Sequence, residues 1–251
     1  MRLISYNIEY CEGTTHGVWE YLNAAHALRS PKGLDKRMAS FLANQDPDIL
    51  GLVEVDEGSF RSRERDETAF FADRLGLSNI VKTQKYRGGW RRALKLLPIL
   101  KHQDNAVLTK HEVKSATFHE LSKGFKNVVI EVTLSEPSVH TVLLVHLALF
   151  RGTRRTQLLE LRRLVNDINT PILLCGDFNT FSSEELNYLL EETRLRDAYS
   201  GREGFTQPSW NPTHRLDNVL VTNDVDVTDY RVLDAHFSDH LPVQVDYEVT
   251  Q

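Results

Sequence analysis

Several apolar segments of this sequence run directly into carboxylate, amide or imidazole groups, which bind cations and move protons. Glu54 follows one such segment, and Asp177 and Asn179 follow another. His146 lies inside a third segment, and Asn7 interrupts the first apolar run of the chain. An ionised group at the edge of a core costs free energy unless something compensates it. A hard divalent cation among carboxylate and amide oxygens is one such compensation, and the carboxyl ends of strands in α/β sheets are where ligands bind.

Each of these residues, taken alone, also has a purely structural explanation. A glutamate after a strand is usually a solvated loop residue, and Gly176-Asp177-Phe178-Asn179 alone is also typical of an Asx turn. His146 alone is more typical of a core histidine bonded to a backbone carbonyl. Ser238-Asp239-His240 alone is typical of an ordinary loop. The functional interpretation therefore depends on the segments occurring together.

Taken together and in this order, the segments resemble the motifs of the endonuclease/exonuclease/phosphatase superfamily, the metal-dependent phosphoesterases related to deoxyribonuclease I. The resemblance covers residues 2 to about 245, and its most specific pieces are the Gly-Asp-Phe-Asn and Ser-Asp-His segments. It implies an α/β (α+β) fold, a four-layered sandwich of two packed, mostly antiparallel sheets flanked by helices, with the site at one end. The segments are Ser5-Tyr6-Asn7-Ile8, Leu52-Val53-Glu54-Val55, Asn105-Ala106-Val107-Leu108, His146-Leu147, Gly176-Asp177-Phe178-Asn179, Arg215-Leu216-Asp217 and Ser238-Asp239-His240-Leu241-Pro242.

The resemblance implies a cation site and a phosphate site made of oxygen-bearing side chains. Glu54 would bind Mg²⁺ or Mn²⁺, with Asn7 beside it and Asp239 on the same side. Oxygen ligands suit these ions, and a chain with only two cysteines is a poor match for zinc. Asp177 and Asn179 would orient the attacking water and hold the phosphate.

The resemblance also implies a catalytic dyad of His240 and Asp217, in which the carboxylate fixes the imidazole tautomer and favours the imidazolium. His146 would donate to a phosphate oxygen or to the leaving group, and Asn105 is a further candidate for contacting the substrate. His240 and Asp177 both remain open as the general base.

The hydrophobic periodicity predicts a single α/β domain over residues 1–251, with strands alternating with a few helices and outnumbering them. A capping box of Ser182 and Glu185 is expected to open the last helix. The other two helices are indicated by apolar faces within 34–42 and 158–168. The predicted strands are 2–8, 48–53, 105–109, 127–134, 141–147, 172–175, 216–221 and 242–249.

A basic stretch in the middle of the chain bears on the substrate. Residues 82–103 hold seven basic residues and no acidic one. Basic residues interleaved with Tyr86 and Trp90 suit a nucleic-acid backbone and a stacked base. Trp90, Arg91 and Arg92 are therefore the expected substrate contacts in this stretch. The leucines of the same stretch would also suit a membrane interface that presents lipid phosphodiesters, or simple packing on the core.

We therefore expect a phosphodiesterase that acts on nucleic acid in preference to lipid. A sphingomyelinase-like lipid-headgroup phosphodiesterase, a small-molecule phosphatase and a non-catalytic binding module on the same fold are the alternatives. The sequence gives no sign of an obligate protein partner.

Composition excludes several other classes. The chain has 251 residues, a formal net charge of −5 and 41% hydrophobic residues, which is typical of a globular protein. It has no run of about 18 apolar residues and no secretory signal at its start, which predicts a cytoplasmic protein. Two cysteines, Cys11 and Cys175, exclude a disulfide framework and a Cys-rich zinc site and fit a reducing compartment.

Overall fold

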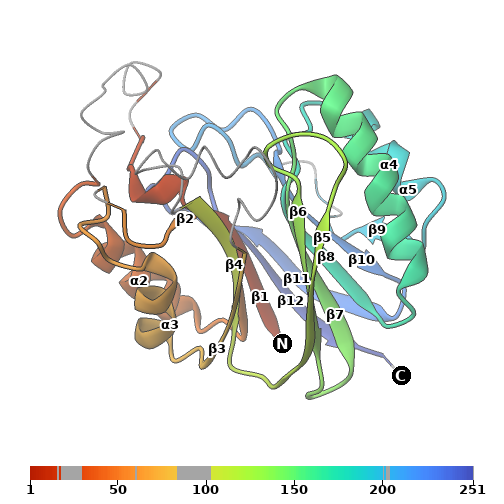
Figure 1. Ribbon diagram of the computed structural model, residues 1–251, viewed down its shortest axis with the longest axis horizontal. Helices are drawn as coiled ribbons and strands as arrows, with labels where there is room; N and C mark the ends of the chain where they lie inside the picture. Colours follow the sequence, from red (N-terminus) through yellow and green to blue (C-terminus); the bar gives the residue numbers. More distant parts are fainter. Residues whose placement is uncertain are drawn as a thin grey trace.

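Two packed sheets form the centre of the fold, and helices cover their outer faces. The computed structural model describes residues 1–15, 17, 30–59, 61–83, 103–199, 201 and 204–250. Within these ranges, each sheet has six strands and there are four α-helices (Figure 1). The helices are α2 (Leu34–Gln45), α3 (Glu67–Leu75), α4 (Arg151–Asp167) and α5 (Asn187–Leu190).

The first sheet has the order β11-β12-β1-β2-β4-β3, and the second has the order β5-β6-β7-β8-β10-β9. Among the described strands, β1 and β2 are the parallel neighbours of the first sheet, β7 and β8 those of the second, and the other pairs are antiparallel. The strands of the first sheet are β1 (Arg2–Asn7), β2 (Ile49–Asp56), β3 (Asn79–Lys82), β4 (Gln103–Thr109), β11 (Val225–Val232) and β12 (Val243–Val249). Those of the second are β5 (Val113–Glu120), β6 (Val128–Leu134), β7 (His140–His146), β8 (Ile172–Asp177), β9 (Leu195–Asp197) and β10 (Asp217–Thr222).

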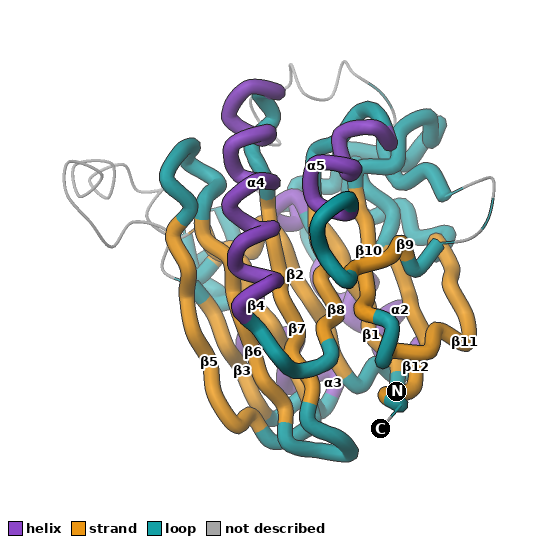
Figure 2. Tube along the Cα trace, turned by 90° about the vertical axis from the view of Figure 1, so that its right-hand side faces the viewer, coloured by secondary structure: helices purple, strands orange, loops and turns teal. Residues whose placement is uncertain are grey.

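Strand alternation places apolar side chains on both faces of each sheet. In β1, Leu3 faces the core between the sheets, whereas Ile4 packs in the core beneath α2 and α3. In β8, Leu173 faces the other sheet and Leu174 packs beneath α4 and α5. A fully buried side chain of this size stabilises the fold by roughly 1.5–3 kcal/mol, so both faces of these strands hold them in place. The result is four layers, with helices outside both sheets (Figure 2).

The predicted fold class is therefore confirmed, and each predicted strand corresponds to an observed one whose ends differ from the predicted ends by at most three residues. Ser182 caps the 3-10 helix Ser183–Leu186 that leads into α5, as expected, and its hydroxyl accepts from Glu184 N at 3.3 Å. The other half of the expected capping box is wrong, because the Glu185 side chain does not bond back to Ser182. The Glu185 carboxylate instead binds Arg154 of α4 through both oxygens, at 2.8 and 2.9 Å. A buried guanidinium needs a counterion, and that need overrides the local capping preference.

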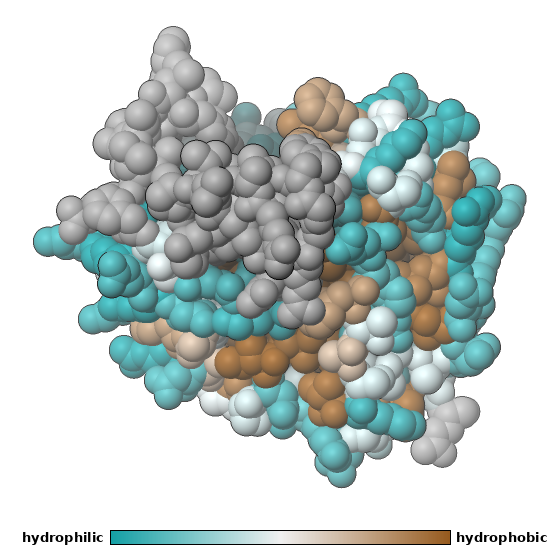
Figure 3. Space-filling model, viewed as in Figure 1, coloured by the Kyte–Doolittle hydropathy of each residue, from teal (hydrophilic) through white to brown (hydrophobic). Residues whose placement is uncertain are grey.

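The periodicity did not predict α3, β3, β5, β9 or β11. Strands β5 and β11 expose much of their length, since they lie at the ends of their sheets and carry many polar residues. Hydrophobic side chains gather in the lower middle of the face in Figure 3, over the region between α3 and β7. Cys11 and Cys175 are buried and carry free thiols. Across the described residues, no helix combines the length and the apolar character needed to cross a membrane.

Candidate active site

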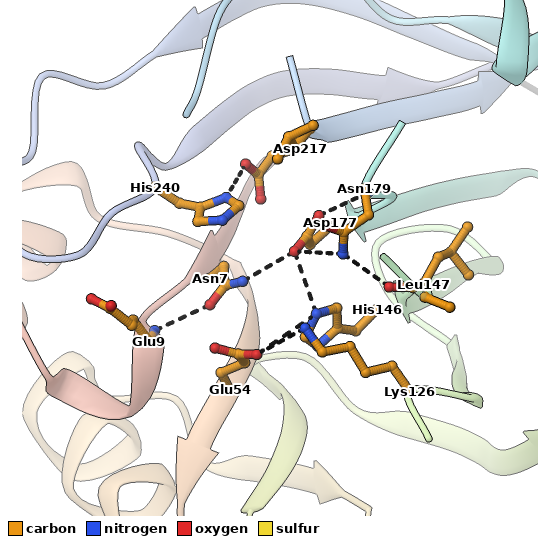
Figure 4. Close-up of polar contacts among 12 residues, drawn as sticks. Asn7, Glu9, Glu54, Lys126, His146, Leu147, Asp177, Asn179, Asp217 and His240 are labelled. Atoms are coloured by element: carbon orange, nitrogen blue, oxygen red, sulfur yellow. Dashed lines mark hydrogen bonds and ion pairs between the residues drawn. The ribbon is translucent and has the colours of Figure 1, made fainter. Parts of the chain in front are cut away.

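One end of the sandwich gathers the polar residues that end the central strands (Figure 4). Asn7 ends β1 and Glu54 lies near the end of the parallel strand β2. In the second sheet, His146 and Asp177 end the parallel strands β7 and β8 as direct neighbours in register. Asp217 begins the antiparallel strand β10, opposite Asp177. The topology therefore brings together residues that lie up to 210 positions apart in the chain, because each central strand ends at the same edge.

Four groups hold the Asp177 carboxylate in place. Asn7 Nδ2 donates to its Oδ2 at 3.1 Å, and His146 Nε2 lies 3.4 Å from the same oxygen. The backbone N–H of Asn179 donates to Oδ1 at 2.9 Å, and the Asn179 side-chain amide donates to Oδ2 at 3.2 Å and to Leu147 O at 2.9 Å. Burial and the neighbouring Asp217 raise the pKa of Asp177 to about 6, although His240 opposes the shift.

His240 and Asp217 form a buried pair, with 2.7 Å between Nδ1 of the imidazole and Oδ2 of the carboxylate. Burial lowers the pKa of His240, but the charges of Asp217 and Asp239 and the hydrogen bond that Asp217 accepts from the imidazole raise it well above its ordinary value. Ser238 orients this loop, since its hydroxyl donates to Asn7 O at 2.7 Å and accepts from His240 N at 3.1 Å. The arrangement favours the imidazolium at neutral pH.

Glu54 projects from an irregular point in β2, where the register with β4 shifts between Leu52 and Val55. Its backbone N–H donates to the side-chain oxygen of Asn105 at 3.2 Å, and its φ of +58° lies in the left-handed region. Lys126 Nζ lies 3.1 Å from Glu54 Oε1, and His146 Nε2 lies 3.8 Å from the same oxygen. A bulge of this kind re-aims a side chain, which here directs the carboxylate into the site.

A cavity of about 380 Å³ lies among these side chains, and the predicted site residues His146 and Asp217 contact residues of its lining without lining it themselves. Besides Glu54, its wall includes three more residues with positive φ, Glu9 at +48°, Tyr10 at +49° and Asn179 at +52°. Non-glycine residues with strained backbone cluster at functional sites, where the surrounding structure holds them. The full lining is Asn7, Glu9, Tyr10, Glu12, Glu54, Lys126, Leu149, Asp177, Asn179, Phe181, Gln207, Leu216, Asp239 and His240.

The donor set of this cavity fits a divalent cation. Burial and the charge of Asp239 raise the pKa of Glu9 to about 9, and burial raises that of Glu12, with Glu54 among the charges that add to the shift. A divalent cation among these carboxylates would offset their mutual repulsion, and carboxylate and amide oxygens are the ligands that Mg²⁺ and Mn²⁺ prefer. The buried cluster of Asp177, Asp217 and His240, whose ligand atoms lie within 4.8 Å of one another, is also compatible with an ion.

Lys126 and Glu9 line the cavity although no sequence pattern predicts a role for either. No sequence signal distinguishes Lys126, which precedes β6 and reaches the site only because β6 pairs with β7. The predicted contact residue Asn105 is not among the residues lining the cavity and instead holds the backbone of Glu54. The other predicted substrate contacts, Trp90, Arg91 and Arg92, lie outside the described residues.

Gly176 allows β7 and β8 to approach each other directly before Asp177. Its φ is +132°, and a Cβ at this position would lie 2.0 Å from Val145 O. We expect Gly176→Ala to lower the free energy of unfolding by about 2–6 kcal/mol, the sum of backbone strain and overpacking. Gly152→Ala in α4 is the matched control, because its Cβ would meet nothing within 4 Å. Urea denaturation measures both variants, and equal stability of the two would contradict this account of Gly176.

The chain is similar to known proteins in its sequence pattern and in its fold. Among protein-family models, the one described as the Endonuclease/Exonuclease/phosphatase family matches residues 4–240. No relative was found among the curated proteins. Solved structures with the same fold include an endonuclease/exonuclease/phosphatase family protein from Bacteroides thetaiotaomicron, with a TM-score of 0.75 and 14% identity, covering 100% of this chain and 98% of that one.

Two further structures resemble this chain over nearly their whole length. The mannosyl-6-phosphatase of Bacteroides thetaiotaomicron VPI-5482 has a TM-score of 0.74 and 16% identity, with 99% of each chain covered. ANGEL2, a 2',3'-cyclic phosphatase solved with adenosine-2',3'-vanadate, has a TM-score of 0.70 and 16% identity, with 100% of this chain and 96% of that one covered. At sequence identities of 14% and 16%, these similarities show a shared fold and nothing about a shared substrate.

Proposed function

The chain belongs to the endonuclease/exonuclease/phosphatase family, whose members hydrolyse phosphoester bonds, and we propose that it is a Mg²⁺- or Mn²⁺-dependent phosphodiesterase of nucleic acid. One observation carries the proposal. The side chains of Asn7, Glu54, Asp177, Asp239 and His240, which come from separate strands and loops, line a single cavity. Hydrolysis of a phosphodiester needs a positioned water, neutralisation of the phosphoryl charge and help for the leaving oxygen.

Glu54, Asn7 and Asp239 are the residues that would hold the ion in this proposal. When bound there, Mg²⁺ or Mn²⁺ would supply neutralisation of charge on the phosphoryl oxygens. The Lys126 ammonium, 3.1 Å from Glu54 Oε1, would add a second positive charge beside the phosphate. Lys126 keeps its proton, because Glu54 and Asp177 raise its pKa by more than burial lowers it.

The shifted pKa values of Asp177 and His240 favour different roles for these two candidate bases. A pKa of about 6 leaves Asp177 ionised at neutral pH and close to the value that suits a general base, so it would accept the proton of the attacking water. The raised pKa of His240 keeps the imidazole protonated, so it would donate to a phosphoryl oxygen. Asp217 would fix its orientation through the 2.7 Å hydrogen bond.

His146 and Asn179 would complete the cradle for the phosphoryl group. His146 is fully buried and lies 3.4 Å from Asp177 Oδ2, a position from which its ring would orient the base. Asn179 donates to both oxygens of Asp177, one bond from its backbone N–H and the other from its side-chain amide. These positions are expected to lower the barrier by electrostatic stabilisation of the transition state.

The preference for nucleic acid rests on the basic, aromatic stretch at 82–101 of the sequence. The resemblance of the fold to ANGEL2, whose structure holds an adenosine vanadate, supports a nucleotide substrate. The second candidate function is that of a small-molecule phosphatase, which is supported by the similar fold of the mannosyl-6-phosphatase.

A substrate panel tests the proposal. The protein is incubated with bis-p-nitrophenyl phosphate, single- and double-stranded DNA, RNA, sphingomyelin and inositol phosphates, with Mg²⁺, with Mn²⁺ and with EDTA. We expect hydrolysis of the model diester and of nucleic acid, loss of both with EDTA and recovery when the ion is restored. Turnover of sphingomyelin or of phosphomonoesters alone would overturn the nucleic-acid proposal. No turnover of any ester by folded protein would favour a binding module.

A further inference from the structure

A second cavity lies beside the catalytic one and shares the Phe181 side chain with it. Its volume is about 480 Å³, within the range of small-molecule sites. Phe181 and Phe205, 48% and 45% exposed, contribute aromatic surface to its wall. Leu186, His214 and Asn218 contribute further lining. None of these residues takes part in the chemistry proposed above.

Two consecutive residues of strand β10 belong to the two sites, one to each. Asp217 binds His240 of the dyad, whereas Asn218 points to the other face of the sheet and lines the second cavity. This alternation follows from the two-residue period of a strand. A ligand that occupied both cavities would therefore pass the Phe181 side chain, which lines both.

Asn218 carries an unused hydrogen-bond acceptor. The residue is only 1% exposed, and its Nδ2 donates to Leu216 O at 3.2 Å. Its Oδ1 is buried and has no hydrogen-bond partner among the described residues. Leaving a buried acceptor without a hydrogen-bond partner costs free energy. An N–H group of a ligand in the cavity would remove this cost by donating to Asn218 Oδ1.

The aromatic wall is held rigidly. The ring of His214 meets that of Phe181 edge to face, with centroids 5.4 Å apart, and the Arg154 guanidinium carbon lies 5.8 Å from the Phe181 centroid. Arg154 is buried, pairs with Glu185 and donates to Leu149 O at 2.6 Å. Because Leu149 lines the catalytic cavity, Arg154 fixes the walls of both cavities at once.

The part of the wall formed by Phe205 is connected to the catalytic dyad through the next residue, Thr206. Thr206, next to Phe205, accepts from the backbone N–H groups of Leu216 and Asp217 at 3.2 Å each. Its own N–H donates to His214 O at 2.8 Å. The aromatic wall and the dyad therefore keep a fixed relative position, which is what a ligand spanning both cavities requires.

We propose that the second cavity is a base subsite, in which the nucleobase of the substrate packs on Phe181 and donates an N–H to Asn218 Oδ1 while its phosphate occupies the catalytic cavity. This proposal rests on the proposed function and narrows its substrate to nucleotide phosphoesters. An acyl chain would leave Asn218 Oδ1 unpaired, and a sugar phosphate without a base would leave the aromatic wall uncovered.

Calorimetric binding of mononucleotides tests the base subsite. In the presence of Mn²⁺, the affinities of AMP, GMP and CMP, each with an exocyclic amino group, are compared with that of ribose 5-phosphate, which has no base. Stacking of one base predicts that the tightest nucleotide binds roughly 5-fold to 150-fold better than ribose 5-phosphate. Equal affinities would overturn the proposal.

Single substitutions test which residues of the second cavity bind the nucleobase. Phe181→Ala is expected to abolish most of the nucleotide preference, because it should weaken nucleotide binding far more than ribose 5-phosphate binding. Asn218→Ala should reduce nucleotide affinity roughly 3-fold to 10-fold. Phe118→Ala on β5 is the matched control, since Phe118 is also exposed, at 39%, and lines neither cavity. Because Phe181 is exposed, its variant should fold even where Asn218→Ala does not, and an unchanged preference in Phe181→Ala would overturn the proposal.

Binding and turnover separate this proposal from the proposed function. A nucleotide preference that depends on Phe181 in a protein that hydrolyses no phosphodiester would support the base subsite and reject the phosphodiesterase. Hydrolysis of bis-p-nitrophenyl phosphate without any nucleotide preference would support the phosphodiesterase and reject the base subsite.

Discussion

His240→Ala should lower kcat for phosphodiester hydrolysis by roughly 10²–10⁴-fold, because it removes both a proton donor and a positive charge from the phosphoryl site. The side chain is buried beside Asp177 and Asp217, where the low dielectric strengthens its interaction with a developing negative charge. The variant is measured by steady-state hydrolysis of bis-p-nitrophenyl phosphate at saturating metal. We expect kcat to change far more than KM, since the interaction strengthens in the transition state.

The control for this prediction lies four residues earlier in the same segment. His236 also pairs with an aspartate, with 2.7 Å between its Nε2 and Asp234 Oδ1, but both side chains are exposed. His236→Ala should keep full activity. A His240→Ala protein that folds and turns over within a few-fold of the unchanged enzyme would show that the dyad is structural.

Glu54→Gln should weaken the affinity for Mg²⁺ or Mn²⁺ by at least about 100-fold. Substitutions of residues that merely support a ligand cost 10–100-fold, and a direct carboxylate ligand should cost no less. The change keeps the side-chain shape and removes the charge that pairs with Lys126 at 3.1 Å. The metal concentration that gives half-maximal activity measures the effect, and calorimetric titration with Mn²⁺ measures it without turnover.

Glu120→Gln provides the comparison, because Glu120 is an exposed glutamate on β5 that does not line the catalytic cavity. It should leave the metal dependence unchanged. Full activity of Glu54→Gln at the same metal concentration as the unchanged protein would remove Glu54 from the proposed ion site.

The strands and the polar residues that end them are predictable from the sequence because both follow local rules. A strand buried on both faces is a continuous apolar run, and Asp177 or Glu54 interrupts such a run where a purely structural residue would be apolar. The order of the segments then identifies the family, which the family model confirms over residues 4–240. Edge strand β11 was missed because its polar, half-exposed residues carry no such run.

The parts that escaped prediction depend on contacts between distant segments. Lys126 precedes a strand of the second sheet but contacts Glu54 of the first sheet, and no motif in the neighbouring sequence predicts this contact. Glu185 follows Ser182 at capping-box spacing, yet it pairs with Arg154 because a buried guanidinium must be neutralised. The base subsite likewise combines Phe181, His214 and Asn218 from three segments, each unremarkable alone.

Crystals grown with Mn²⁺ and a non-hydrolysable phosphodiester analogue, with anomalous diffraction measured near the manganese absorption edge, test the central claim most directly. The account predicts an anomalous peak within coordination distance of Glu54 carboxylate oxygens, with the phosphoryl group between that peak and His240. A peak coordinated only by residues outside the catalytic cavity, or an active crystal whose cavity binds no ion at millimolar Mn²⁺, would contradict it.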